Sequence, residues 1–226
     1  ATNSVTGTKP LVIDNTAPTV TLSTPLNGTK VNSGALSWNA ATESVGLASS
    51  PYVVKVSTNS NMASPIITSS ALSVTTYTAP SLVSGTTYYW QVTATDLAGN
   101  SGTSAIWSFT YDTTAPTVTL LSPTNNAKVN TGLLSWNPAT ESVGLASSPY
   151  VVKVSQNPDM SSPDITSSAQ SGTTYTALSL VSGTTYYWQV TVTDAAGNSG
   201  TSAIWSFTYD TTAPTVTLLS PTNNAK

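Results

Sequence analysis

The chain has 226 residues, a net charge of −3 and only 7% charged residues, and it contains no cysteine, histidine or arginine. The lack of cysteine excludes disulfides, thiol nucleophiles and zinc–thiolate centres, and the lack of histidine removes the commonest general base and metal ligand. The lack of arginine in an acidic chain argues against nucleic-acid binding. The sequence has no run of about 20 apolar residues, so neither a membrane span nor a signal peptide is predicted.

The sequence repeats with a period of 98 residues. The nine residues that begin at Asp14 return with one change at Asp112 and again at Asp210, so the spacing is 112 − 14 = 98 and 210 − 112 = 98. Residues 14–111 align with 112–209 without a gap and differ at 19 of 98 positions. A fixed period of this kind is the signature of a repeat architecture.

The repeat sets the predicted domain boundaries. We expect two complete domains, residues 14–111 and 112–209. Residues 1–13 are interpreted as the C-terminal strand of a preceding repeat, and residues 210–226, identical to 112–128, as the first strand of a following one. The chain is therefore expected to be a window from a longer tandem array.

Within a repeat, short apolar or alternating runs lie between turn residues, which predicts about seven strands and no helix. In the second repeat they are, in chain order, Thr117–Leu121, Gly132–Trp136, Tyr150–Ser155, a weak strand near Ile165, Thr173–Ala177, Thr184–Asp194 and Ile204–Tyr209. The predicted fold class is all-β, with tandem antiparallel β-sandwiches.

Alternation of side chains assigns the face of the longest strand that packs on the core, because residues two apart point to the same side of a sheet. The residues expected in the core of the second repeat are Tyr186, Trp188, Val190 and Val192 on that strand, together with Trp136, Val152, Val154, Leu180, Trp205 and Phe207.

Three motifs resemble those of one domain family. They are Trp136 on the second strand, the Leu-Val-Ser-Gly-Thr-Thr-Tyr segment from Leu180 to Tyr186, and the Asp-Ala-Ala-Gly-Asn turn from Asp194 to Asn198. With the Asp-Thr-Thr-Ala-Pro junction, they resemble bacterial fibronectin type III and immunoglobulin-like tandem repeats of extracellular surface proteins, of adhesin or fibre type. The resemblance implies seven-stranded Greek-key sandwiches and brings no catalytic residues.

If the topology is fibronectin-like, the carboxylates that the two repeats share gather where the chain enters each domain. These residues and a neighbouring amide are Asp14, Glu43, Asp96 and Asn100 in the first repeat, and Asp112, Glu141, Asp194 and Asn198 in the second. Such oxygens are calcium ligands, so they are candidate inter-domain calcium sites, although the fold is expected to require no cofactor. The alternative is that Asp and Asn stabilise ordinary turns.

The function expected from the sequence is structural: a stalk, adhesin shaft or filament at the cell surface or outside the cell, acting as a semi-rigid spacer. Pro18 and Pro116 favour extended linkers between repeats. One alternative is a multivalent, low-affinity glycan- or protein-binding module that uses the loops Thr42–Pro51 and Thr140–Pro149. Another is a spacer attached to a secreted polysaccharide-degrading enzyme.

Enzyme activity is not expected. Serine and threonine make up 77 of the 226 residues, but a hydroxyl nucleophile needs a positioned base and the chain has no histidine. The expected partners are neighbouring repeats of the same chain and lateral copies in a fibre, reached through the edges of the sandwiches. No nucleic-acid partner is expected, and the glycan or host-protein ligand is left open.

Overall fold

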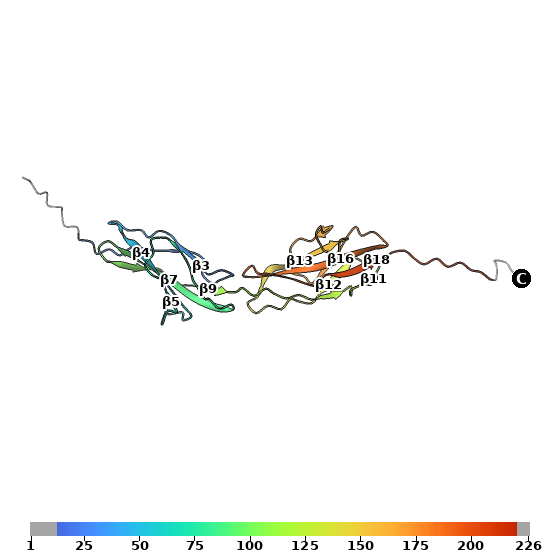
Figure 1. Cartoon of the computed structure of the whole chain (residues 1–226), viewed down its shortest axis with the longest axis horizontal. Coiled ribbons are helices and arrows are strands. Elements are labelled where there is room, and N and C mark those ends of the chain that lie inside the picture. Colours follow the sequence, from blue (N-terminus) through green and yellow to red (C-terminus); the bar gives the residue numbers. More distant parts are fainter. Residues whose placement is uncertain (1–12, 221–226) are drawn as a thin grey trace, which may run out of the picture. The chain divides into compact units, whose positions relative to one another are not determined.

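The computed structural model describes residues 13–220, and the chain divides into two units, Ala1–Thr114 and Ala115–Lys226. Each unit is a sandwich of two β-sheets (Figure 1), and residues 13–220 contain no helix. No helix that could span a membrane is therefore found in this part of the chain. The predicted all-β class is confirmed.

Each unit contains nine strands. Those of the first unit are β1 (Leu22–Thr24), β2 (Thr29–Val31), β3 (Ala35–Trp38), β4 (Leu47–Ser57), β5 (Ile67–Thr68), β6 (Thr76–Thr78), β7 (Thr86–Asp96), β8 (Ser101–Thr103) and β9 (Trp107–Tyr111). Those of the second unit are β10 (Leu120–Ser122), β11 (Ala127–Val129), β12 (Leu133–Trp136), β13 (Leu145–Ser155), β14 (Ile165–Thr166), β15 (Thr174–Thr176), β16 (Thr184–Asp194), β17 (Ser199–Thr201) and β18 (Trp205–Tyr209).

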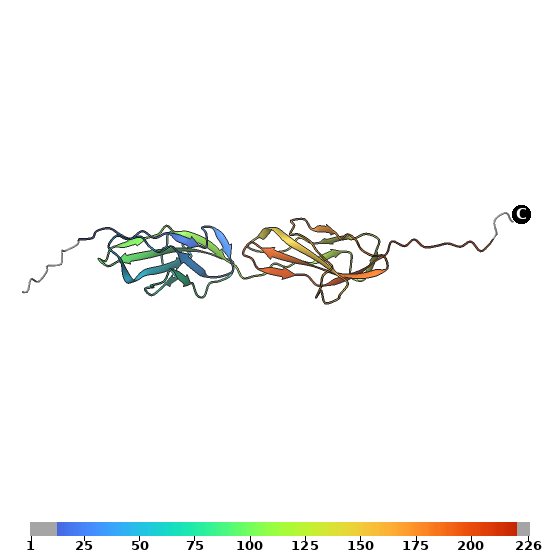
Figure 2. The same ribbon diagram turned by 90° about the horizontal axis from the view of Figure 1, so that it is seen from above.

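The strands of the first unit form two layers, which Figure 2 shows from a second direction. One sheet has the order β1-β3-β6, and the other has the order β2-β9-β7-β4-β5, with β8 paired to β7. The second unit repeats this arrangement strand for strand. All pairings are antiparallel except β2 with β9 and β11 with β18, which are parallel.

Two short strands in each unit were not predicted. In the second unit these are β11 and β17, each three residues long. Neither is long enough to show an alternating pattern, and β17 contains Gly200, a residue depleted in strands. Strand β13 also begins five residues before the predicted start, because Leu145 pairs with Asp194 across an irregular register.

The core of the second unit largely agrees with the prediction. Its buried residues include Trp136, Val152, Val154, Tyr186, Trp188, Val190, Val192 and Phe207. Two predictions were wrong in degree: Leu180 and Trp205 are only half-buried and pack against the edge of the core. Fully buried Leu134 was not predicted, although it lies two residues before Trp136 on β12 and therefore on the same face of the sheet.

The Leu-Val-Ser-Gly-Thr-Thr-Tyr segment closes one end of each sandwich. The Val181 backbone NH donates a hydrogen bond of 3.0 Å to the Tyr186 hydroxyl oxygen, and Val83 does the same to Tyr88 at 2.9 Å. The buried tyrosine therefore has a polar partner for its hydroxyl group, which explains why the motif places tyrosine there and not phenylalanine.

The two flanking predictions have different outcomes. Residues 1–12 lie outside the described residues, whereas residues 210–220 are described and contain no strand. Val216 and Leu218 are 84% and 86% exposed, although the identical Val118 and Leu120 are buried. The difference arises because Leu120 pairs with Trp136 of β12, whereas residues 211–220 belong to no strand in the described part of the chain and Asp210 donates its backbone NH to the Val129 carbonyl oxygen of β11.

The close approach of β17 to the entry segment gives a first prediction. A Cβ on Gly200 would lie 1.9 Å from the Pro116 carbonyl oxygen, whereas a Cβ on Gly172 would meet nothing within 4 Å. Gly200→Ala should lower the free energy of unfolding by about 1–3 kcal/mol, as overpacking does. Gly172→Ala is the matched control, and equal melting temperatures for the two variants by calorimetry would contradict the contact.

Candidate functional site

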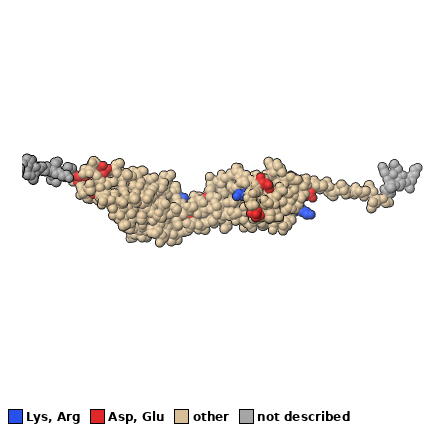
Figure 3. Space-filling model, turned by 45° about the horizontal axis from the view of Figure 1, so that its top comes forward, with Lys and Arg blue, Asp and Glu red and all other residues tan. Residues whose placement is uncertain are grey.

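The site considered is the pole of the first unit where its described chain begins. Figure 3 shows acidic atoms gathered there, and uncharged residues make up most of the surface in this view. Three segments contribute: the entry segment with Asp14, the loop between β3 and β4 with Glu43, and the end of β7 with Asp96.

Backbone pairing explains why segments far apart in sequence meet at this pole. Thr19 and Thr42 exchange two backbone hydrogen bonds of 3.1 and 2.9 Å, which place the entry segment beside the residue that precedes Glu43. Leu47 pairs with Asp96, so the start of β4 lies beside the end of β7. Backbone pairing therefore brings the three segments together at this pole.

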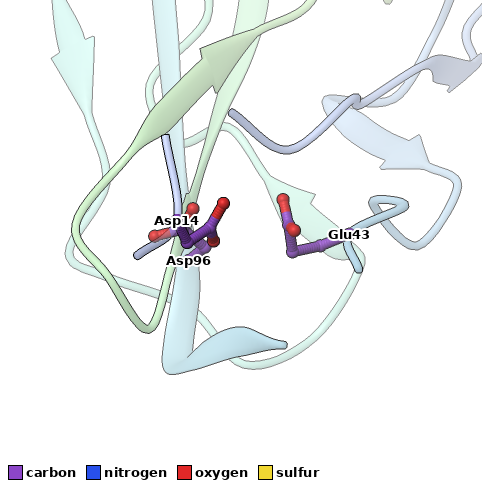
Figure 4. Close-up of side chains that lie close together, drawn as sticks. All are labelled: Asp14, Glu43 and Asp96. Carbon is purple, nitrogen blue, oxygen red and sulfur yellow. The ribbon is translucent and has the colours of Figure 1, made fainter. Parts of the chain in front are cut away.

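The structure brings the three carboxylates together. One carboxylate oxygen from each of Asp14, Glu43 and Asp96 lies within 4.8 Å of the other two. In Figure 4, Asp14 and Asp96 lie close together, with Glu43 approaching from a separate loop. Asp96 is only 2% exposed, while Asp14 and Glu43 are half-buried.

Each of the two half-buried carboxylates uses one oxygen in its own turn. Asp14 Oδ1 accepts a hydrogen bond of 3.0 Å from the Thr16 NH, and Glu43 Oε1 accepts bonds of 2.6 and 3.2 Å from the Ser44 and Val45 NH groups. Their second oxygens, Asp14 Oδ2 and Glu43 Oε2, are shielded from solvent and have no hydrogen-bond partner. The turn interpretation accounts for the first pair of oxygens and leaves the second pair unexplained.

Asn100 holds the third carboxylate in place. Its backbone NH donates to Asp96 Oδ1 and its Nδ2 to Asp96 Oδ2, both at 2.8 Å, and Nδ2 also donates to the Asp14 carbonyl oxygen at 3.1 Å. The amide nitrogen, not the amide oxygen, therefore faces the carboxylates. Asn100 positions Asp96 and the entry segment, which differs from the ligand role predicted for it.

The electrostatics of Asp96 follow from these contacts. Burial alone would raise the pKa of Asp96, but hydrogen bonds from the Asn100 side chain and from the NH groups of Asn100, Gly99 and Ala98 outweigh it and hold the pKa below its usual value. The folded state therefore favours the charged carboxylate.

This pKa shift predicts an acid-dependent loss of stability. Because the pKa of Asp96 is lowered on folding, its contribution is present above the unfolded value of about 3.9 and disappears as the pH falls through the folded value. In EDTA, the wild-type melting temperature should fall more steeply than that of Asp96→Asn between pH 4 and pH 2. Parallel curves for the two proteins would contradict this assignment.

The lysines described in the first unit lie far from the cluster. Lys55 pairs with Gln91, which is five residues from Asp96 along β7, or about 16 Å at ~3.3 Å per residue. Lys30 pairs with Thr110, and Thr110 with Thr87 at the other end of β7, about 30 Å from Asp96. Neither strand position lets a lysine offset the like charges at this pole.

A shallow hollow gives access to the cluster. It has a volume of about 350 Å³ and is lined by Glu43 together with Thr16, Ala17, Thr19, Thr42 and Ser44. Its walls offer hydroxyl, carbonyl and carboxylate oxygens and no nitrogen base. Such a surface suits a hard cation with its water.

The predicted residues of the second repeat occupy the corresponding sequence positions. Asp112 is buried and its Oδ1 accepts hydrogen bonds from Ser84 Oγ at 2.9 Å and the Thr114 NH at 3.0 Å. Asp194 Oδ2 accepts from Asn198 Nδ2 at 2.8 Å, and Glu141 Oε1 accepts from the Val143 NH at 3.0 Å. The contact with Ser84 was not predicted, because 28 residues separate it from Asp112.

The predicted binding loop of the second unit is only partly a loop. Leu145–Pro149 belongs to β13, so only residues 140–144 of the predicted loop lie outside that strand. The equivalent stretch in the first unit is likewise shortened by β4, which begins at Leu47. This leaves a small surface for the recognition role considered for these loops.

Comparison with known proteins identifies the fold family. A model of the Rha78A-like, N-terminal immunoglobulin domain matches residues 16–114 and again residues 113–211. The chain belongs to this family. The predicted relationship to bacterial immunoglobulin-like and fibronectin-like repeats is thereby confirmed, and the tandem Rha78A-like domains account for both units described above.

The Rha78A-like domains also resemble parts of larger proteins. The chain is 32% identical over 203 residues to chitinase A1 of Niallia circulans, an alignment that covers 85% of this chain and 26% of that protein. It thus spans about a quarter of the length of its curated relative.

Solved structures support the fold alone, since their sequence identity is low. The fibronectin(III)-like modules of Clostridium thermocellum CbhA give a TM-score of 0.51 at 17% identity, covering 85% of this chain and 94% of theirs. The FN1–FN3 domains of chicken CNTN1 give 0.53 at 17% identity, covering 86% and 68%.

Proposed function

We propose that this chain is a non-catalytic structural segment of a longer extracellular bacterial protein, in which each Rha78A-like domain adds length as a semi-rigid spacer. The carrying observation is that the family model matches twice in tandem, while the similarity to chitinase A1 extends over only 26% of that protein. Two repeats that agree at 98 − 19 = 79 of 98 positions suit a part that supplies repeated length.

The hydroxyl side chains support a structural role. On the six-stranded sheet of the first unit, Thr87 bonds Thr110 and Thr93 bonds Thr103, each at 3.0 Å across neighbouring strands. The second unit has the same two pairs, at 3.1 and 3.3 Å. Cross-strand pairs of this type contribute about 0.2–1 kcal/mol each, so the high Ser and Thr content has a role in sheet stability.

The parent protein we infer is a secreted polysaccharide-degrading enzyme that carries these domains as an accessory segment. The support is the 32% identity to a part of chitinase A1. A stalk, adhesin shaft or filament of a surface protein is the second candidate, and the near-identity of the two repeats favours it. Both candidates use the domains in the same way, as spacers outside the cell.

A glycan-binding role rests on a different surface. In the second unit a hollow of about 260 Å³ is lined by Asn125, Asn126, Pro158, Tyr187, Ile204 and Ser206. An aromatic ring beside amide and hydroxyl groups is the kind of surface that binds sugars. However, Asn125 Oδ1 already accepts the Ser206 NH at 2.8 Å and Asn126 Oδ1 accepts the Ser206 hydroxyl at 2.8 Å, so part of its polar capacity is used internally.

The experiment that tests the spacer role is co-sedimentation of the chain with insoluble chitin and cellulose, together with an assay for cleavage of chitin oligosaccharides. The expected result is that the chain stays in the supernatant, like an albumin control, and releases no product. Retention that Tyr187→Ala abolishes would support the glycan-binding role instead, and cleavage would contradict a non-catalytic segment.

A further inference from the structure

We propose that Asp14, Glu43 and Asp96 form a calcium site that ties the entry segment of the domain to the β3–β4 loop and the end of β7. The three residues are 29 and 53 positions apart in sequence (43 − 14 and 96 − 43), and each comes from a different segment. A shared cation would link them without any covalent bond.

Two buried oxygens without a partner are the main support. Asp14 Oδ2 and Glu43 Oε2 are shielded from water and receive no hydrogen bond, although each residue's other oxygen is bonded to the backbone. A buried polar atom that lacks a partner is destabilising, and a carboxylate oxygen beside two other carboxylates is more so. A cation between them removes both penalties at once.

The oxygen chemistry of the cluster suits calcium. Its three ligand oxygens lie within 4.8 Å of one another, and calcium, which binds oxygens at about 2.3–2.6 Å, can bridge oxygens up to about 5 Å apart. Magnesium demands a near-ideal octahedron of ligands at about 2.0–2.1 Å. Calcium also accepts irregular sets of six to eight ligands, which three loop carboxylates and water can supply.

Asn100 fixes the positions of Asp96 and of the entry segment that carries Asp14. Its two hydrogen bonds to Asp96 fix that carboxylate, and its bond to the Asp14 carbonyl fixes the backbone of the entry segment. Asp14 and Asp96 are therefore held in place by Asn100. Glu43 is held by the hydrogen bonds that its Oε1 accepts from the NH groups of the next two residues.

The test is isothermal titration of calcium into the full chain after treatment with EDTA and dialysis. The expected result is a calcium heat from the wild type, with weaker heats for magnesium, and Glu43→Gln should lose one bound ion per chain. Asp159→Asn, which removes an exposed charge outside the cluster, is the matched control and should bind like the wild type.

Three results would overturn the proposal. They are no calcium heat from the wild type, an unchanged stoichiometry in Glu43→Gln, and equal affinity for calcium and magnesium. The wild-type titration decides the question even if a variant fails to fold. The proposal is independent of the spacer role, because chitin sedimentation and calcium titration are separate measurements.

Discussion

Replacing Trp188 with alanine should make the second unit unfold at a temperature far below that of the first. The Trp188 side chain is fully buried on β16 and packs edge-on against Trp205, with ring centroids 6.5 Å apart. Removing a buried tryptophan costs about 3–5 kcal/mol, which for a domain of this size corresponds to a drop in melting temperature on the order of 20 °C. Calorimetry of Trp188→Ala should therefore resolve two transitions, one for each unit, whereas the two units of the wild type should unfold at similar temperatures.

Two further variants control this experiment. Trp90 is the equivalent residue of the first unit and is also fully buried, so Trp90→Ala should move the other transition by a similar amount. Trp188→Phe should be much milder, because the indole Nε1 of Trp188 is buried without a hydrogen-bond partner and phenylalanine removes that donor. A single cooperative transition in Trp188→Ala would show that the units do not unfold independently.

Calcium should raise the melting temperature of the first unit in the wild-type chain and leave that of the first unit in Glu43→Gln unchanged. Binding at a hundredfold excess over the dissociation constant stabilises a folded state by about 2.7 kcal/mol, which corresponds to a shift on the order of 10 °C for a domain of this size. Thermal unfolding in EDTA and in excess calcium measures the shift directly.

The melting temperature of Glu43→Gln in EDTA distinguishes the loss of a calcium ligand from damage to the fold. In Glu43→Gln the amide retains the oxygen that accepts the Ser44 and Val45 NH groups, and its nitrogen replaces the oxygen that has no partner. In EDTA this variant should therefore melt at or above the wild-type temperature. A large destabilisation in EDTA would show that Glu43 has a structural role that the calcium account omits.

The long strands and the core were largely predictable from the sequence. Thr184–Asp194 was predicted with its observed bounds, because eleven alternating residues leave one possible register for burial. The short strands β11 and β17 were not predicted, since their existence depends on long-range partners: β11 on β18, about 80 residues away, and β17 on β16. Three residues carry too little local pattern to show such pairings.

The composition of the candidate site was also predictable, but its bonding was not. The repeat indicates Asp14, Glu43 and Asp96 as candidates because both copies have the same residues at these positions, and the topology explains why the three residues meet. The direction of the Asn100 amide depends on atoms in two other segments, so a sequence motif could not give it. The same is true of the two carboxylate oxygens that lack a partner.

The central claim is that each repeat adds length, and one deletion tests it most directly. Removing residues 112–209 joins Tyr111 to Asp210 and restores the native junction, because residues 210–226 are identical to 112–128. The longest strands have 11 residues, or about 36 Å at ~3.3 Å per residue, so small-angle scattering should show the maximum dimension falling by about 35 Å. Nearly equal maximum dimensions for the full and shortened chains would mean that the units fold back on one another, and would contradict the spacer role.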